Sequence, residues 1–289
     1  MACIAMKAYA KINLYLDVTA RRADGYHELL TVMQSISLFD TLTVERSVQK
    51  GILLDTGGVL PADDSNLVCR AARAYFERSG APFGVTVKLE KQIPMQAGMG
   101  GGSADAAAML KALNRLDDDR FTERELCEIG AAVGADVPFC VVGGTRLCRG
   151  IGEVMEPIPN RLEGTLVVAI GAEGVSTPAA FGELDRRYGD FKERGGKKRP
   201  TALLDAMARG DIAAAAPHFE NLFEEVILPL RPAVGEIKRT MQEMGAAASM
   251  MSGSGPSVWG IFERAADAER AKAALLAAGY RAYTCNMLS

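Results

Sequence analysis

A glycine-rich run in this 289-residue chain, GMGGGS at 98–103, leads into the alanine-rich segment ADAAAMLKALNRL at 104–116. We expect that segment to be a helix with Ser103 as its N-cap. The free N–H groups at a helix N-terminus and the positive end of the helix dipole attract anions, and glycines leave them accessible. The run therefore predicts a phosphate site, although the segment alone could also be a tight turn that binds nothing.

Three common signatures are missing from the sequence. It contains no G-x-x-x-x-G-K-[ST] loop, and it has no H-R-D or D-F-G motif. The glycine run ends in Ser103, where the dinucleotide fingerprint has Gly or Ala. A Walker-type loop, a dinucleotide site and a protein kinase are therefore excluded.

Two charged residues lie close to predicted elements. Lys11 falls inside a predicted strand, where a lysine needs either water or an anionic partner. Asp136 follows a predicted helix in GADVP at 134–138, and a carboxylate in such a loop is free to face a cleft. Val137 is expected to be extended because it precedes a proline. Structural roles remain open, since Lys11 could lie at a surface and Asp136 could end a helix.

An exposed turn carries a second group of candidates. The segment RRADGYH at 21–27 contains the Asp-Gly pair of a turn and then presents Tyr26 and His27. Asn13 lies on the strand before it. The structural alternatives are packing for Tyr26, a hydrogen-bonded surface position for His27 and the end of a strand ladder for Asn13.

Hydrophobic periodicity and capping signals define the elements that must position these residues. In the first half we expect strands at 8–18, at 29–46 with a break near Phe39-Asp40, and at 83–91. We also expect one helix from Ser65 or Asn66 to Gly80 and another from Thr122 to Gly134. The second of these helices opens with a capping-box pattern.

The hydrophobic pattern restarts after a glycine-rich stretch, so we expect two domains, 1–158 and 159–289. The second domain has predicted strands at 164–171, 257–262 and 280–287 and predicted helices at 232–245 and 265–278. This order predicts an α+β layer with helices on one face of a sheet. The basic segment 191–200 is interpreted as a solvated surface loop, with a phosphate or partner contact as the alternative.

Composition limits the function classes. The chain is 48% apolar and 24% charged with a net charge of -3, which is typical of a globular protein and argues against a long nucleic-acid-binding surface. It has neither a run of ~18 apolar residues nor a secretory signal, so we expect a cytoplasmic protein without membrane contact. The six cysteines form no C-x-x-C pair and the two histidines lie far apart. Reduced, mostly buried thiols are therefore expected instead of a zinc site or disulfides.

Four segments resemble the GHMP kinase superfamily in sequence, order and spacing: AKINLYLDVTARRADGYHEL at 10–29, PMQAGMGGGSADAAAMLKALN at 94–114, GADVPF at 134–139 and SGSGPSV at 252–258. RRADGYH and GMGGGSADAA are similar to one branch in particular, whose acceptor is a methylerythritol linked to cytidine diphosphate. The resemblance covers nearly the whole chain. It implies a two-domain α+β fold, with an N-terminal domain like that of a ribosomal protein and a ferredoxin-like C-terminal domain.

For that branch, the resemblance implies a small-molecule kinase of the non-mevalonate isoprenoid pathway. ATP, accompanied by Mg²⁺, would phosphorylate the 2-hydroxyl group of the erythritol in a cleft between the domains. No metal ligand is assigned, because Gly101 and Gly102 stand where many members carry a pair of serines, and Ser103 is the hydroxyl that remains nearby. The expected partners are ATP and this small-molecule substrate, without nucleic acid or membrane, in a monomer or weak homodimer.

The resemblance also implies roles for individual residues. Asp136 is similar to a general base that takes the proton of the substrate hydroxyl, and Lys11 to a charged neighbour that steadies the γ-phosphoryl oxygens. Asn66 and Lys91 correspond to contacts near the adenosine. The triphosphate would be held by a loop comprising Pro94, Gly98, Gly100, Gly101, Gly102, Ser103 and Ala104.

The expected acceptor site follows from the same resemblance. Tyr26 and Phe181 correspond to two rings that stack on a cytosine, and His27 corresponds to the residue that reads the edge of that base. Asn13 and Thr177 would lie near the erythritol hydroxyls or the diphosphate.

Three alternatives remain open. Another kinase of the superfamily, acting on homoserine, mevalonate or a sugar, would share the ATP loop but not the acceptor site. A non-catalytic sensor with this fold would keep the ligand pocket, but the presence of both Lys11 and Asp136 argues against it. A nucleic-acid-binding protein is disfavoured by the balanced charge.

Overall fold

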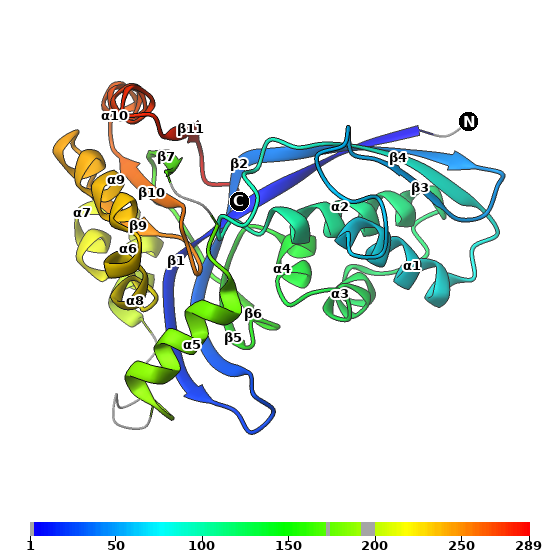
Figure 1. The fold of residues 1–289 in the computed structure, drawn as a ribbon, viewed down its shortest axis with the longest axis horizontal. Coiled ribbons are helices and arrows are strands. Elements are labelled where there is room, and N and C mark those ends of the chain that lie inside the picture. Colours follow the sequence, from blue (N-terminus) through cyan, green and yellow to red (C-terminus); the bar gives the residue numbers. More distant parts are fainter. Residues whose placement is uncertain (1–2, 172–173, 192–199) are drawn as a thin grey trace. The chain divides into compact units, whose positions relative to one another are not determined.

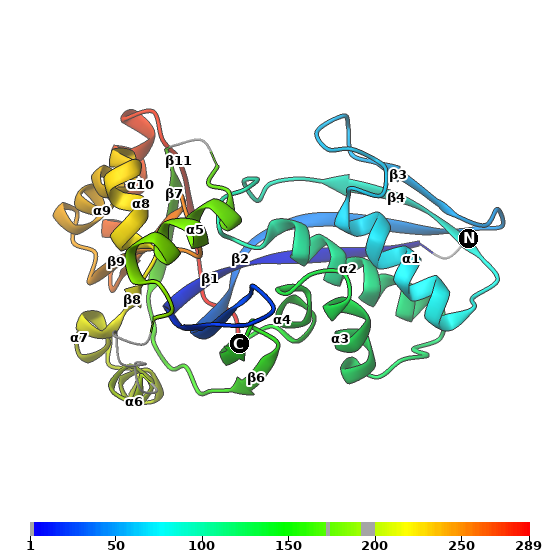
Figure 2. The same ribbon diagram turned by 60° about the horizontal axis from the view of Figure 1, so that its bottom comes forward.

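The computed structural model describes residues 3–171, 174–191 and 200–289 (Figures 1 and 2). The chain forms two compact units that alternate along the sequence. Unit 1 comprises residues 1–11, 38–95 and 100–143, and unit 2 comprises residues 12–37, 96–99 and 144–289. The predicted boundary at 158/159 falls inside unit 2, so these interleaved units are not the two predicted sequence domains, whose limits stay a prediction.

Unit 1 is a sheet covered on one face by four helices (Figure 1). Its strands are the first part of β1 (Cys3–Arg21), the second part of β2 (His27–Ser47), β3 (Ile52–Asp55) and β4 (Gly84–Glu90). β4 runs antiparallel to β2 and parallel to β3. The helices are α1 (Leu67–Ser79), α2 (Gly101–Leu116), α3 (Glu123–Ala131) and α4 (Val137–Val142). α2 packs against the other three, so the helix that follows the glycine run is the central one of this layer.

Local capping signals start two of these helices as predicted. The Asn66 side chain accepts a hydrogen bond from the backbone of Val68 at 3.0 Å, and α1 ends at Gly80, whose φ of 65° is left-handed. Thr122 and Glu125 form the predicted capping box at the start of α3. Each of these capping bonds joins residues two or three apart, which is why the sequence alone predicts them.

The predicted N-cap of α2 is wrong. The helix begins at Gly101 with Gly100 as its N-cap, not at Ser103. Gly100 has a φ of 66°, which glycine adopts without the steric penalty that a Cβ would bring. The helix N-terminus therefore lies within the glycine run, where the backbone carries no side chains.

Two other local predictions are also wrong. Val137 is helical and not extended, because Pro138 occupies the first turn of α4, where a missing N–H leaves no helical bond unmade. β2 continues unbroken through Phe39-Asp40, because the buried Asp40 carboxylate has hydrogen-bond donors around it. The first conformation follows from the position of the neighbouring proline in the helix, and the second from partners 52 and 53 residues away in the sequence.

Unit 2 contains a four-stranded antiparallel sheet with helices packed against it, which confirms the predicted α+β layer. The strand order is β11-β7-β10-β9, and α9 and α10 pack on this sheet. The strands are β7 (Thr165–Ile170), β9 (Ala248–Met251), β10 (Val258–Phe262) and β11 (Arg281–Cys285), and the helices are α9 (Pro232–Glu243) and α10 (Ala265–Ala277). Buried apolar residues such as Val167, Phe262 and Leu275 form the core between these layers.

Unit 2 also contains strands that continue the sheet formed by β1 and β2, together with several further helices. β5 (Thr145–Gly150) pairs antiparallel with β2 and with β6 (Val154–Pro157), and β8 (Glu220–Asn221) pairs parallel with β1. The other helices are α5 (Thr177–Tyr188), α6 (Thr201–Arg209), α7 (Ile212–Ala215), η2 (Ala216–His218) and α8 (Glu224–Leu230). Most of the predicted surface loop at 191–200, namely residues 192–199, lies outside the described residues.

The cysteines are free thiols, of which three are buried, two are half-buried and Cys3 is exposed. Among the described residues, no three His, Cys, Asp or Glu side chains are grouped so that they could hold a metal ion. In the same parts of the chain, no helix combines the length and the apolar character needed to cross a membrane.

Candidate functional site

The start of α2 has the geometry of an anion site. The Gly100 carbonyl accepts a hydrogen bond from the Ala104 N–H at 2.8 Å, which is the first bond of the helix. The N–H groups of Gly101, Gly102 and Ser103 precede that bond and have no acceptor within the helix. Gly102 is exposed, and Gly101 and Ser103 are half-buried. These three N–H groups, at the positive end of the helix, can therefore bind a phosphate.

Lys11 and Asp136 meet beside this helix start. Lys11 Nζ lies 3.5 Å from Asp136 Oδ2, and the Lys11 side chain is 6% exposed whereas that of Asp136 is 32% exposed. A Cβ on Gly100 would lie 3.1 Å from Lys11 Cγ, so the lysine side chain passes against the glycine. Asp136 precedes α4 without making a side-chain capping bond, which leaves its carboxylate available to a ligand. The structure thus brings together residues that come from three separate segments of the sequence.

Lys91 is buried between two carboxylates. Its ammonium group forms ion pairs with Asp40 and, at 2.6 Å, with Asp105. Asp40 also accepts hydrogen bonds from the backbone of Gln92 and Ile93. The three charged side chains are at most 7% exposed, and this Asp40–Lys91–Asp105 triad ties α2 to β2 and to the segment after β4.

The triad lies directly under the start of α2, because a Cβ on Gly101 would be 3.5 Å from Lys91 Nζ. The pKa of the Asp105 carboxyl is raised to about 7, chiefly by burial; the Lys91 ammonium group opposes this rise and the neighbouring Asp40 adds to it. The predicted contact of Lys91 with adenosine stays a prediction. Neither aspartate is predicted from the sequence, although each is a lone acid in an apolar segment, which is the signal that could have found it.

Asn66 has structural contacts at both ends of its amide. Its Oδ1 accepts the capping bond from Val68, and its Nδ2 donates to the carbonyl of Pro61 at 2.9 Å. Its predicted contact with adenosine stays a prediction. Pro94 and Ala104 are buried at either side of the glycine run, so their side chains support the loop from within.

In unit 2, Ser252 joins the glycine run to β1. Its Oγ donates to the Gly98 carbonyl at 3.0 Å and accepts from the Asn13 N–H at 3.3 Å. The neighbouring hydroxyl of Ser254 shares a hydrogen bond of 2.9 Å with Thr177 Oγ1. This serine-glycine loop therefore contacts three predicted site residues. Its own serines are functional candidates that the prediction left out, although the sequence had singled out the segment.

Gly98→Ala is expected to destabilise this loop. Gly98 has a φ of 75°, and an added Cβ would overlap the Ser252 carbonyl oxygen. We expect the free energy of unfolding to fall by about 2 kcal/mol, because backbone strain and overlap act together. Urea unfolding followed by circular dichroism measures the change. Gly57→Ala is the matched control, since Gly57 has a φ of 60° with open space around it, and equal losses in the two variants would show that the Ser252 contact is unimportant.

Of the predicted acceptor residues, Tyr26 and His27 lie at the turn between β1 and β2, which packs beside α5 (Figures 1 and 2). Phe181 on α5 stacks on the His27 ring, with centroids 4.4 Å apart and planes 16° apart. His27 is 7% exposed, and its Nε2 lies 2.7 Å from Asp185 Oδ1. Tyr26 is 60% exposed, and its N–H donates to Asp24. Phe181 therefore contacts His27, and a cytosine between Tyr26 and Phe181 stays a prediction.

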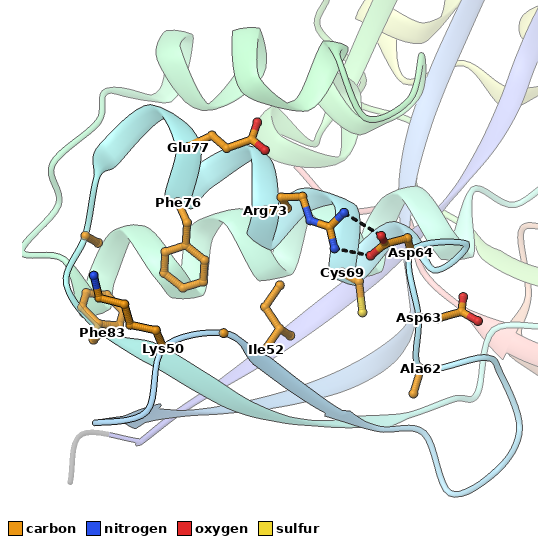
Figure 3. Close-up of a pocket in the computed structure, with 12 residues that line it drawn as sticks. Lys50, Ile52, Ala62, Asp63, Asp64, Cys69, Arg73, Phe76, Glu77 and Phe83 are labelled. Atoms are coloured by element: carbon orange, nitrogen blue, oxygen red, sulfur yellow. Dashed lines mark hydrogen bonds and ion pairs between the residues drawn. The ribbon is translucent and has the colours of Figure 1, made fainter.

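An open pocket of about 350 Å³ lies elsewhere in unit 1, between α1 and β3 (Figure 3). It contains none of the predicted site residues. Arg73 and Asp64 form an ion pair in its lining, and both side chains are more than half exposed. The pocket therefore has no part in the candidate site.

Comparison with known proteins gives one family for both parts of the chain. Residues 66–144 match the family described as GHMP kinases N terminal domain, and residues 203–281 match GHMP kinases C terminal. A protein of Alkaliphilus oremlandii named 4-diphosphocytidyl-2-C-methyl-D-erythritol kinase is 42% identical over 277 residues, which cover 95% of this chain and 92% of the relative.

Two solved structures extend the comparison. The crystal structure of a 4-(cytidine 5'-diphospho)-2C-methyl-D-erythritol kinase superposes with a TM-score of 0.83 at 36% identity, and covers 99% of this chain and 100% of its own. A homoserine kinase from Cytophaga hutchinsonii superposes with a TM-score of 0.75 at 20% identity, over 98% of this chain and 95% of its own. The second likeness concerns the fold alone.

Proposed function

Because the chain belongs to the GHMP kinase family, and within it to the 4-diphosphocytidyl-2-C-methyl-D-erythritol kinases, we propose that it transfers the γ-phosphoryl group of ATP to the 2-hydroxyl group of 4-diphosphocytidyl-2-C-methyl-D-erythritol. The products are the 2-phosphate and ADP, in the non-mevalonate route to isoprenoids. The observation that carries the proposal is the Lys11–Asp136 pair beside the helix start, which combines a partly exposed carboxylate, a cation and an anion site.

The proposed chemistry needs in-line positioning and charge neutralisation more than covalent catalysis. Asp136 accepts the proton of the 2-hydroxyl group as the hydroxyl oxygen bonds to the γ-phosphorus. The bond from that phosphorus to the bridging oxygen of ADP breaks in the same displacement. Lys11 stabilises the negative charge on the γ-phosphoryl oxygens, and the free N–H groups at the start of α2 hold the triphosphate.

The proposal includes Mg²⁺ as the companion of ATP. Mg²⁺ prefers oxygen ligands and is commonly held by one or two protein groups together with substrate phosphates. The hydroxyl group of Ser103, a half-buried residue on the first turn of α2, fits that requirement. When bound, the ion supplies neutralisation of charge on the phosphates.

The proposal assigns the two nucleosides and the erythritol to separate groups of residues. Tyr26 and Phe181 stack on the cytosine, and an aromatic stacking contact of this kind contributes about 1–3 kcal/mol per base. The edge of that base is read by His27. The remaining proposed contacts are Asn13 and Thr177 for the erythritol or the diphosphate, and Asn66 and Lys91 for the adenosine.

An assay of ADP release tests the function. The purified protein receives Mg-ATP with 4-diphosphocytidyl-2-C-methyl-D-erythritol, homoserine or mevalonate in parallel reactions. Turnover with the cytidine compound alone is the expected result. Turnover with homoserine or mevalonate would show that the proposed acceptor is wrong. ATP binding without any turnover would favour a non-catalytic sensor.

Tyr26→Ala is expected to weaken binding of the cytidine compound about 5–150-fold, which corresponds to the loss of one stacking contact. Tyr26 is 60% exposed, so removal of its ring changes stability little. The shift in melting temperature on adding cytidine diphosphate, with and without the substitution, measures the effect. Tyr9→Ala is the matched control, because Tyr9 is also an exposed tyrosine but lies in unit 1. An undiminished shift in Tyr26→Ala would remove Tyr26 from the base site.

A further inference from the structure

Asp185 on α5 is a half-buried partner of His27 that the proposed reaction does not use. His27 Nε2 lies 2.7 Å from Asp185 Oδ1, and Arg21 Nε lies 3.6 Å from the other carboxylate oxygen. The side chain of Asp185 is 21% exposed and that of His27 is 7% exposed, whereas Arg21 is 52% exposed. Of the two contacts of Asp185, the one with the His27 imidazole is therefore both shorter and more buried than the one with Arg21.

The His27 ring is held in one orientation. Phe181 stacks on one face at 4.4 Å between centroids, and Phe191 meets the ring at 5.7 Å with an angle of 82° between the planes. With Asp185 bonded to Nε2, rotation of the ring would break a hydrogen bond and two aromatic contacts. Among the described residues Nδ1 has no hydrogen-bond partner, so this nitrogen is left to bind a ligand.

The contact with Asp185 also decides which ring nitrogen carries the proton. A carboxylate has no proton to donate at neutral pH, so it can only accept a hydrogen bond from Nε2–H. A neutral imidazole carries one proton, and placing it on Nε2 leaves Nδ1 as a bare acceptor. A ligand that meets Nδ1 must therefore offer a donor.

We propose that Asp185 is a positioning residue that sets the base specificity of the acceptor site, by holding His27 in the tautomer whose Nδ1 accepts a hydrogen bond. Cytosine presents an exocyclic amine as a donor at the position where uracil presents a carbonyl oxygen. Nδ1 can pair with the amine, whereas it would face a second acceptor in uracil. This inference rests on the proposed function, because it takes His27 as the residue that reads the edge of the base.

The kinetic test compares two acceptors that differ only in the base. We would measure kcat/KM at pH 8 for the cytidine-diphosphate-linked and the uridine-diphosphate-linked methylerythritol. The wild type is expected to favour the cytidine compound by about 100-fold or more, since an unpaired acceptor at a buried contact is strongly rejected. In Asp185→Asn, whose amide can either accept or donate, the ratio should fall about tenfold through a higher KM for the cytidine compound, with kcat nearly unchanged.

Glu183→Gln is the matched control, because it removes a carboxylate from the same helix and Glu183 pairs with Arg186 at the surface. It should leave the ratio unchanged. Asp185→Glu retains the carboxylate and should keep more of the discrimination than Asp185→Asn. If Asp185→Asn folds normally and keeps the wild-type ratio within about twofold, Asp185 does not set the specificity.

Nitrogen-15 NMR of the His27 ring gives a readout that does not depend on turnover. The wild type should show a proton on Nε2 and a bare Nδ1, and Asp185→Asn should show a mixture of tautomers. A proton on Nδ1 in the wild type would overturn the inference. Turnover of neither compound, with the expected tautomer present, would count against the proposed function instead, and the two failures are thereby distinguished.

Discussion

Asp136→Asn is expected to lower kcat by about 10²–10⁴-fold, the range that general-base catalysis contributes. The amide has nearly the shape of the carboxylate but cannot take the proton of the attacking hydroxyl. Asp136 makes no capping bond and is partly exposed, so we expect the variant to fold although it loses the ion pair with Lys11. Steady-state ADP release gives kcat, and calorimetric titration with ATP and with the acceptor should show near-normal binding of both.

Asp118→Asn is the matched control for this loss. Asp118 is an exposed aspartate in unit 1 with a φ of 56°, a conformation that asparagine also tolerates. The control should keep the wild-type kcat. If Asp136→Asn also kept it, Asp136 would not be the base. A loss of ATP affinity in place of turnover would assign the carboxylate to the metal-nucleotide complex.

Asp40→Ala is expected to lower the free energy of unfolding by about 3–5 kcal/mol, the usual loss when one partner of a buried ion pair is removed. The substitution leaves the backbone N–H groups of Gln92 and Ile93 without their acceptor. It also leaves the buried Lys91 with Asp105 as its remaining carboxylate in the triad. Urea unfolding of the purified variant measures the loss.

Asp64→Ala provides the comparison for an exposed pair. Its partner Arg73 is 54% exposed and Asp64 itself is 63% exposed, so we expect a loss of at most about 1 kcal/mol. If Asp40→Ala does not fold, Asp40→Asn keeps an acceptor oxygen and should still unfold more easily than Asp64→Ala. Equal stability of Asp40→Asn, Asp64→Ala and the wild type would show that the triad does not stabilise unit 1.

Much of the fold follows from local sequence signals. The Asn66 cap, the Thr122 capping box and the α+β layer of the second half depend on residues close together in the chain, and the structure confirms them. The helix start at Gly100 does not follow from such signals. Serine is the common capping residue, but a glycine with a positive φ precedes it in the chain and starts the helix earlier.

The candidate site also combines residues that local motifs indicate with residues that local motifs do not indicate. The motifs drew attention to Lys11 and Asp136, and the structure puts these two side chains in contact, although their roles stay proposals. The partners that orient the site residues are separated from them by large distances in sequence. Asp40 lies 51 residues from Lys91, and Asp185 lies 158 residues from His27. No local pattern specifies such pairs, because tertiary packing alone brings them together.

The alternation of the two units along the chain limits how segments can be exchanged between relatives in protein engineering. The polypeptide passes from one unit to the other at five points, so neither unit corresponds to a single stretch of the gene. Asn13, Tyr26 and His27 are encoded near the start of the chain, whereas Asp185 and Ser252 are encoded in its second half, and all five belong to unit 2. A chimaera made by exchanging the C-terminal half between two relatives would therefore split the proposed acceptor site. Acceptor preference in this architecture can be transferred only by exchanging several separate segments together.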